Sequence, residues 1–220
     1  GAHQVKWDGL TTPSAGMPGD PVPTGKYTWS ALWNTGIGLK LRGWAANGGN
    51  APWDNGPTSN WGGDEGDPAA TATDANHVYL GWSFAEAGQA MVACDLDGNV
   101  LWKNKRGGMA GIKAIAAVDG TVYVLGGGAG GAASGGALYK VQAADGQYVA
   151  WANTTDTDLA ISSLWPAGTT GPDKADFIAA AGGKLYLSFG EAGQIAVLDA
   201  ASGHLLKTIK TASPGALQVA

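Results

Sequence analysis

The feature that most constrains this sequence is a segment plan that occurs three times after residue 67. Each copy has a short stretch of alternating apolar and polar residues centred on a tyrosine, namely Tyr79, Tyr123 and Tyr186. An apolar run follows, and then a turn at Asp97-Gly98, Asp145-Gly146 or Ser202-Gly203. Alternation predicts half-buried strands, and glycine supplies the positive φ that tight hairpins need. Each copy therefore predicts a strand, a hairpin, a second strand, a tight turn and a third strand, which in the second copy would span residues 147–151.

A further strand is predicted before each tyrosine stretch, over residues 68–73, 111–118 and 177–181. Four strands in a unit of roughly 40–50 residues are the sequence signature of a β-propeller blade. This organisation explains why 37 of the 220 residues are glycine, because hairpin turns and crowded inner strands leave little room for side chains. The sequence thus predicts an all-β fold with about three four-stranded blades.

The predicted propeller part covers residues 68–220, with blades at 68–106, 107–152 and 174–212 and the start of a further blade at 213–220. Propeller rings close with about 4–8 blades, and an unclosed ring leaves sheet edges open to mispairing. We therefore expect these blades to belong to a larger propeller. Its other blades would come from the remainder of a longer polypeptide, the alternative that we favour, or from further copies of this chain.

The blade endings resemble those of the quinoprotein-like (PQQ-like) β-propeller superfamily. The matching stretches are residues 93–102 and 197–203, which are similar to that superfamily's pattern of alanine-x-aspartate, glycine and tryptophan. The resemblance implies the same fold. It does not imply quinone catalysis, because members that hold the cofactor typically use adjacent cysteines and a calcium site, whereas Cys94 is the only cysteine here. Most members without those features are scaffolds or binding proteins.

The N-terminal segment resembles the end of the immunoglobulin-like domain of flagellar hook-capping proteins. The resemblance is carried by residues 5–9 (Val-Lys-Trp-Asp-Gly) and 22–29 (Val-Pro-Thr-Gly-Lys-Tyr-Thr-Trp). It implies that residues 1–45 are the final strands of an immunoglobulin-like β domain. It also implies a bacterial source and an extracytoplasmic location, secreted or at the cell surface.

Residues 46–67 form a long loop rich in Trp, Asp and Gly, for which two interpretations remain open. In the first, the loop binds a ligand, because tryptophans offer stacking surfaces for a glycan and acidic side chains suit a hard cation such as Ca²⁺. The candidate ligand-binding residues are Trp53, Asp54 and Trp61, and the candidate metal ligands are Asp64, Glu65 and Asp67. In the second interpretation, which we favour, the tryptophans pin the loop to the propeller and the acidic residues cap turns.

Charge and composition exclude several function classes. A net charge of −5 with scattered Lys and Arg disfavours nucleic-acid binding, and no apolar run reaches the roughly 18–20 residues of a membrane span. Glu86 and Glu191 occupy matching contexts in two blades, which indicates a repeated structural turn rather than an acid–base pair. We therefore predict a non-enzymatic, extracytoplasmic module for binding or surface assembly. The alternative is a carbohydrate-active or quinoprotein-like enzyme with its site in the Trp/Asp-rich loop.

Overall fold

The computed structural model describes residues 20–28, 68–85, 89–105, 111–127 and 134–211. The chain divides into two units, Gly1–Lys40 and Leu41–Ala220. In the first unit the described part is residues 20–28, where the Tyr27 hydroxyl donates a hydrogen bond to the Pro23 carbonyl. Most of the segment predicted to be immunoglobulin-like lies outside the described residues. Every named strand lies in the second unit.

The second unit contains three four-stranded antiparallel sheets, and in each of them the strands pair in chain order. The first sheet consists of β1 (Pro68–Thr73), β2 (His77–Trp82), β3 (Gln89–Asp95) and β4 (Val100–Lys105). The second consists of β5 (Ile112–Val118), β6 (Thr121–Gly126), β7 (Ala137–Gln142) and β8 (Asp158–Ala160). The third consists of β9 (Phe177–Ala181), β10 (Lys184–Phe189), β11 (Gln194–Asp199) and β12 (Leu205–Lys210).

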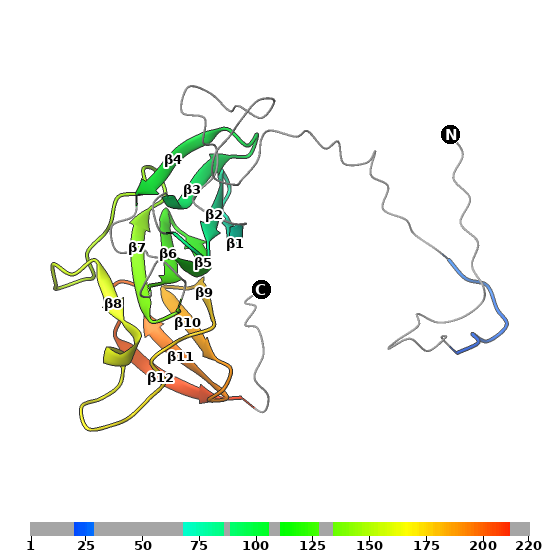
Figure 1. Ribbon diagram of the computed structural model, residues 1–220. Coiled ribbons are helices and arrows are strands. Elements are labelled where there is room, and N and C mark those ends of the chain that lie inside the picture. The colour runs from blue at the N-terminus through cyan, green and yellow to red at the C-terminus, as the bar shows by residue number, and fades with distance from the viewer. Residues whose placement is uncertain (1–19, 29–67, 86–88, 106–110, 128–133, 212–220) are drawn as a thin grey trace. The chain divides into compact units, whose positions relative to one another are not determined.

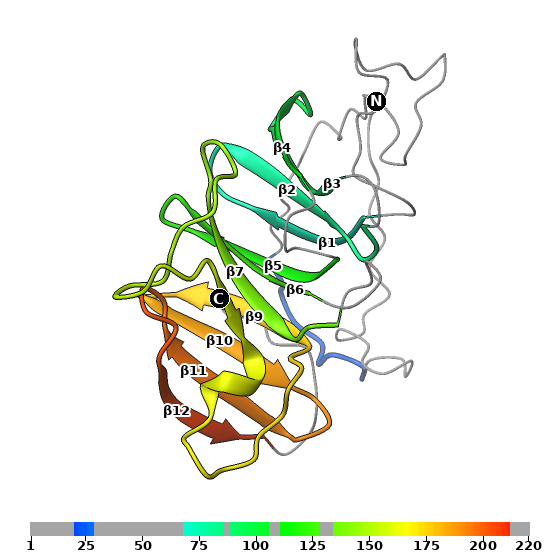
Figure 2. The ribbon, with the colours of Figure 1, turned by 60° about the vertical axis from the view of Figure 1, so that its left-hand side comes forward.

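The three sheets follow one another in a fan, which Figures 1 and 2 show from two directions. The first strand of each sheet lies on the inner side, so that β1 packs beside β5 and β5 packs beside β9. The last strand of each sheet lies on the outer side. Four-stranded antiparallel sheets arranged around a common inner side are β-propeller blades. The predicted all-β fold with three blades is therefore confirmed.

Apolar side chains fill the two interfaces between sheets. In the first junction, between the first and second sheets, Tyr79 and Met91 pack against Ile112 and Val124. The second junction, between the second and third sheets, buries Leu125, Leu138, Ile178, Leu187 and Phe189, among others. Burial of each large side chain contributes roughly 1.5–3 kcal/mol. Packing between sheets, more than strand propensity, therefore holds the blades together.

The tight turn between the last two strands of the repeat has the predicted geometry. The amide of its glycine donates a hydrogen bond to a carbonyl oxygen three or four residues earlier, over 3.0 Å at Gly98, 2.9 Å at Gly146 and 2.8 Å at Gly203. All three glycines have positive φ, at 80°, 72° and 71°. The inner strands also lie where the repeat predicts them, ahead of each tyrosine stretch, with the second starting one residue later, at Ile112.

The second sheet departs from the predicted plan after Gly146. The strand expected over residues 147–151 is reduced to one bridge between Val141 and Tyr148. The chain instead returns as β8, which pairs with β7, and then forms the short 3-10 helix η2 (Ile161–Leu164). The spacing explains this, because Trp151 follows Gly146 by five residues whereas Trp102 follows Gly98 by four. A shift by one residue turns a strand side chain to the opposite face of the sheet. Trp151 packs into the second junction because the chain stops pairing with β7 after Tyr148.

Candidate functional site

The residues proposed from the sequence as a ligand or metal site lie outside the described residues. They are Trp53, Asp54, Trp61, Asp64, Glu65 and Asp67. Glu86 also lies outside them, whereas Glu191 is described and sits in the turn that joins β10 to β11. In that turn the Gly193 amide donates to the Gly190 carbonyl over 3.1 Å. Glu191 therefore lies in a hairpin turn, and the matching turn at Glu86 stays a prediction.

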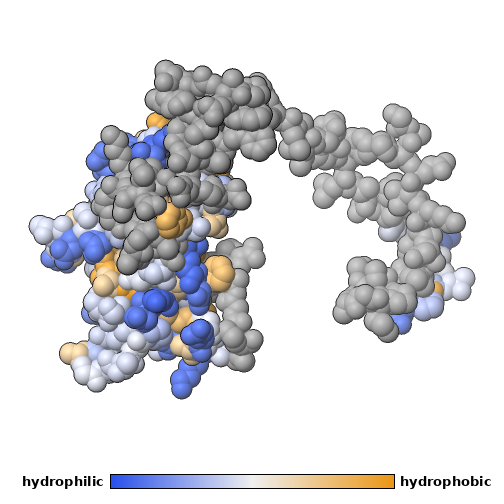
Figure 3. All heavy atoms as spheres, in the orientation of Figure 1, coloured by the Kyte–Doolittle hydropathy of each residue, from blue (hydrophilic) through white to orange (hydrophobic). Residues whose placement is uncertain are grey.

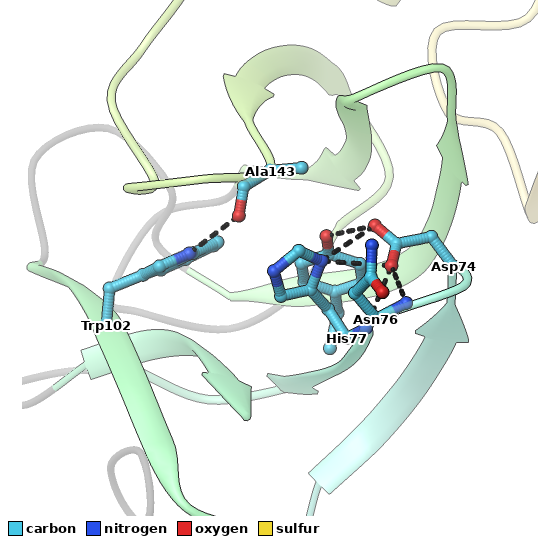
Figure 4. A network of polar contacts seen from close by, with 6 residues as sticks. Asp74, Asn76, His77, Trp102 and Ala143 are labelled. Atoms are coloured by element: carbon cyan, nitrogen blue, oxygen red, sulfur yellow. Dashed lines mark hydrogen bonds and ion pairs between the residues drawn. The ribbon is translucent and has the colours of Figure 1, made fainter. Parts of the chain in front are cut away.

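The first junction shows how one blade covers the next. The Trp102 indole N–H donates to the Ala143 carbonyl over 2.8 Å, as Figure 4 shows, and its ring lies against Gly146. The Asn104 side-chain amide donates to the Gly146 carbonyl, also over 2.8 Å. Trp102 and Asn104 are both buried. Two side chains of β4 therefore donate hydrogen bonds to backbone carbonyls at a turn of the second sheet.

The second junction contacts the corresponding turn of the third sheet with different side chains. The Trp151 ring lies near Gly203 and is buried, but its indole N–H has no hydrogen-bond partner in the described part of the chain. The Tyr123 hydroxyl donates to the Ala200 carbonyl over 3.1 Å. The Lys140 ammonium donates to the next carbonyl, that of Ala201, over 3.0 Å, and stands 4.9 Å from the centre of the Trp151 ring.

The face of the third sheet that points away from the second sheet is the candidate functional site, and we call it the outward face. Register places Phe177, Tyr186, Ile195 and Ile209 on it, because their strand neighbours Ile178, Leu185, Leu187 and Ala196 pack into the second junction. Phe177 is 43% exposed and Ile209 is 40% exposed. Tyr186 and Ile195 are half-buried.

The matching faces of the first two sheets are closed. Tyr79 and Tyr123, which correspond to Tyr186, are 0% and 6% exposed, because the next sheet covers each of them. Among the described residues no further sheet covers the outward face. At its centre Val197 is buried, and the Ser188 hydroxyl is buried without a hydrogen-bond partner. Over the third sheet, Figure 3 shows hydrophobic and hydrophilic residues side by side.

Lys207 occupies the outward-face position that a tryptophan holds in the first sheet. Lys207 pairs with Val197 across β11 and β12, as Trp102 pairs with Ala93 across β3 and β4. Lys207 is exposed, whereas Trp102 is buried. Aligning the three glycine turns of the sequence would have identified this substitution, although only the structure shows which face it changes.

A polar cluster surrounds the turn between β1 and β2. The Asp74 carboxylate accepts hydrogen bonds from the Tyr79 hydroxyl over 2.6 Å and from the His77 and Asn76 amides over 2.8 Å each. Figure 4 shows the His77 ring beside the same carboxylate, with Nδ1 at 2.9 Å. Burial alone would raise the pKa of Asp74, but these hydrogen bonds outweigh it and lower the pKa to about 2. The cluster lies within one hairpin turn, so it serves to fix that turn.

A cleft of about 590 Å³ opens beside the starts of β5 and β9. The Lys113 ammonium forms an ion pair with Asp176 over 2.9 Å, and the other Asp176 oxygen accepts the Gly190 amide over 2.7 Å. The hydrogen bond from Lys113 lowers the pKa of Asp176. The two charged groups are thus engaged with each other, and Asp176 also with backbone. In the described parts of the chain no group of three or more His, Cys, Asp or Glu side chains could share a metal ion.

Comparison with known proteins concerns the fold. No protein-family profile and no curated protein matches the sequence. BamB from Moraxella catarrhalis is 14% identical, with 64% of this chain and 36% of BamB covered and a TM-score of 0.40. The WD40 domain of Neurospora crassa Pan2 is 12% identical, with 65% and 36% covered and a TM-score of 0.44. The quinohemoprotein alcohol dehydrogenase from Comamonas testosteroni is 20% identical, with 66% and 21% covered and a TM-score of 0.42.

These three proteins are β-propellers, and this chain spans about a third of the first two and about a fifth of the last. The similarity is one of fold and carries no activity to this chain. The resemblance of residues 1–45 to an immunoglobulin-like domain stays a prediction. Within the described residues, no helix has both the length and the apolar character needed to cross a bilayer.

Proposed function

We propose that this chain is a non-enzymatic, extracytoplasmic β-propeller module that assembles with further blades through the outward face of the third sheet. The observation that carries the proposal is the difference between equivalent positions. Ala70 and Asn104 of the first sheet are 6% and 7% exposed, whereas Phe177 and Ile209, which hold the same register positions in the third sheet, are 43% and 40% exposed. Large apolar side chains exposed on a sheet face that the other two sheets bury favour an interaction site.

The expected occupant is another four-stranded sheet. Each junction in this chain buries the flat apolar face of one sheet against the next, and the outward face continues that series. The Ser188 hydroxyl, buried without a partner, would gain a donor or acceptor from the covering strands. The covering sheet would belong to the remainder of a longer polypeptide or to a second copy of this chain, and the former is favoured.

Cysteine labelling tests the proposal. Cys94 is 2% exposed, and burial raises the pKa of its thiol to about 11, so the native thiol is unreactive at neutral pH. Maleimide is applied to an Ile209→Cys variant and to a Thr155→Cys control, whose side chain is on an exposed loop. In the protein as its own cells produce it, we expect the Ile209→Cys thiol to be protected and the Thr155→Cys thiol to react. In the isolated 220-residue chain both thiols should react.

Equal labelling of the two variants in the native protein would contradict the assembly proposal. The intact mass of the native polypeptide then separates the two sources of blades. A mass well above 22.1 kDa indicates blades in the same polypeptide, and a mass near that value indicates copies.

The Trp/Asp-rich loop stays a prediction for ligand binding. Calcium titration calorimetry of the chain and of an Asp64→Asn variant, with glycan arrays run beside it, tests the interpretation. Binding that depends on Asp64 or on Trp61 would support the carbohydrate-active alternative over a purely structural loop.

A further inference from the structure

A groove runs along the outermost strand of the third sheet and shares Lys207 with the outward face. It has a volume of about 640 Å³ and lies between β12 on one side and the segment after η2 on the other. Its walls come from Trp165 and Pro172 on one side and from Leu206 and Thr208 on the other, with Gln194 on β11. Proline, tryptophan and leucine give the groove apolar surface, and threonine and glutamine add hydrogen-bonding groups in nearly equal measure.

The wall formed by Trp165 is fixed in place before any ligand arrives. Its indole N–H donates to the Pro172 carbonyl over 2.8 Å. Its ring lies directly over Gly171 and meets the Phe189 ring edge-on, with centroids 5.5 Å apart. A wall held from three sides does not need to be ordered on binding, which lowers the entropic cost of occupying the groove.

The other wall belongs to an edge strand. Among the described strands, β12 pairs with β11 alone, and every β12 residue from Leu206 to Lys210 is exposed. This differs from β4, the edge strand of the first sheet, whose Trp102 and Asn104 are buried against the next blade. An exposed edge strand presents unpaired N–H and C=O groups that can pair with an added extended chain.

Charge at this edge selects the partner. Among the described residues that line the groove only Lys207 is charged, and Lys210 adds a second positive charge on the opposite face of the same strand. Two copies pairing edge to edge would bring lysines together, which is unfavourable. An acidic segment would instead neutralise them, and charge complementarity of this kind favours one class of partner over another.

We propose that β12 binds an extended acidic peptide segment by strand addition, with apolar side chains of that segment in the Trp165 groove and carboxylates on its other face beside Lys207. Backbone pairing would supply affinity, and the alternation of side chains along an extended chain would supply specificity. The proposal uses the free edge of β12 and the Trp165 groove rather than the outward face as a whole, with which it shares Lys207.

Fluorescence anisotropy with defined peptides tests the proposal on the whole chain. The probe is a labelled eight-residue peptide of alternating aspartate and valine. One control peptide replaces aspartate by lysine, and another replaces two valines by proline, which cannot continue a strand ladder. We expect saturable binding of the first peptide alone, with protection of β12 amides from hydrogen exchange.

Charge reversal supplies the matched variants. Lys207→Glu combined with Lys210→Glu should weaken binding of the acidic peptide by about tenfold or more, since each exposed pair contributes up to about 1 kcal/mol and reversal adds repulsion. Lys184→Glu, on β10 and also exposed, should leave binding unchanged. A Leu206→Asp variant should also lose binding. Circular dichroism of each variant confirms that the fold is retained.

Three results would overturn the proposal. The first is equal binding of the proline-containing acidic peptide, which would mean attraction of charge without strand addition. The second is equal binding by the charge-reversed variant. The third is self-association of the chain that the acidic peptide does not displace, which would make a second copy the occupant. Labelling at residue 209 cannot separate this proposal from the assembly proposal, because residue 209 lies on β12. Labelling of a Phe177→Cys variant does, because Phe177 lies on β9 at the other edge of the sheet, beyond the reach of a strand added to β12.

Discussion

The two junctions between blades contact the same turn by different chemistry. In the first junction the contact is made by neutral side chains of a single outer strand, because Trp102 and Asn104 donate hydrogen bonds to the backbone around Gly146. In the second junction, Trp151 covers Gly203 without donating, and the neighbouring carbonyls are bound by Tyr123 and Lys140 instead. The repeated fold therefore fixes which backbone groups must be satisfied but leaves open which side chains satisfy them.

The tyrosines make the same point. The Tyr79 hydroxyl donates to Asp74 within its own sheet, whereas the Tyr123 hydroxyl crosses to Ala200 of the next sheet. In the first junction the tryptophan N–H already occupies the carbonyl at the corresponding position, that of Ala143. Once Trp151 is displaced by the extra residue after Gly146, that carbonyl position becomes available to tyrosine. A one-residue difference in spacing thus redistributes the hydrogen bonds of a whole interface.

The largest expected effect is at the glycines of the two turns. A Cβ at Gly146 would lie 2.5 Å from Cε3 of Trp102, whose ring is held by its own hydrogen bond, and φ there is +72°. Overpacking and positive φ together should make Gly146→Ala cost about 3 kcal/mol in the free energy of unfolding. Urea denaturation followed by tryptophan fluorescence measures it.

Two glycines serve as graded controls for that substitution. At Gly203 the nearest atom, 2.6 Å away, is a terminal methyl of Leu159, which can rotate, and the Trp151 ring is at 3.1 Å. Gly203→Ala should therefore cost about 2 kcal/mol. At Gly120, with φ of +75° and nothing within 4 Å, only backbone strain remains, of about 1 kcal/mol. Equal costs at Gly146 and Gly120 would show that the Trp102 contact is not rigid.

Replacement of each tryptophan by phenylalanine should separate the junctions next. Trp102→Phe removes the donor to the Ala143 carbonyl, and a buried group left without a partner, together with lost ring area, should cost about 2 kcal/mol. Trp151→Phe removes an N–H that has no partner, which offsets part of the lost area. We expect its cost to stay below about 1 kcal/mol by chemical denaturation. A larger cost at Trp151 than at Trp102 would contradict the assignment of roles.

The tyrosine hydroxyls should differ in pH dependence. Because the folded-state pKa of Asp74 is lowered from 3.8 to about 2, its carboxylate contributes stability above pH 4 that is lost as pH falls through 2. Tyr79→Phe removes a bond to that carboxylate and should cost about 1.5 kcal/mol at pH 7, a difference that shrinks as Asp74 becomes protonated. Tyr123→Phe, which loses a hydrogen bond to a neutral carbonyl, should cost about 1 kcal/mol in the free energy of unfolding, at pH 7 and near pH 2 alike. Parallel pH profiles for the two variants would refute this.

Sequence reasoning predicted the strands and the turns because they depend on local signals. Alternation around Tyr79, Tyr123 and Tyr186 and the positive φ of each turn glycine are written in consecutive residues. The position of Trp151 is not written in consecutive residues, because an outer strand forms only where its side chains can reach the neighbouring sheet. The replacement of the expected strand by β8 is therefore a tertiary effect.

The candidate sites divide along the same line. An exposed face is a property of what covers a sheet, so no pattern within β9 or β12 distinguishes Phe177 and Ile209 from buried residues. The Trp165 groove joins residues about 40 apart in sequence. The ligand and metal residues predicted from composition, from Trp53 to Asp67, lie outside the described residues and stay predictions.

The smallest expected effect concerns Lys140, a charged residue that is buried in the second junction. Lys140 is 7% exposed, and burial lowers the pKa of its ammonium. The lowered pKa means that burying the charge opposes folding at neutral pH, and that this cost is relieved as pH rises through the lowered pKa toward 10.5. The Ala201 carbonyl and the Trp151 ring offset part of the cost.

Lys140→Met keeps the apolar stem over Trp151 and removes both the charge and the hydrogen bond to the Ala201 carbonyl. Because Ala201 is exposed, water can replace the ammonium at that carbonyl. The two changes oppose each other, so the free energy of unfolding at pH 7 should change by less than about 1 kcal/mol. Between pH 7 and pH 10 the native protein should gain stability relative to the variant, because only the native protein then sheds a buried charge. A variant that is much less stable at both pH values would mean that Lys140 is an essential tie between the blades, and that the second junction depends on charge where the first does not.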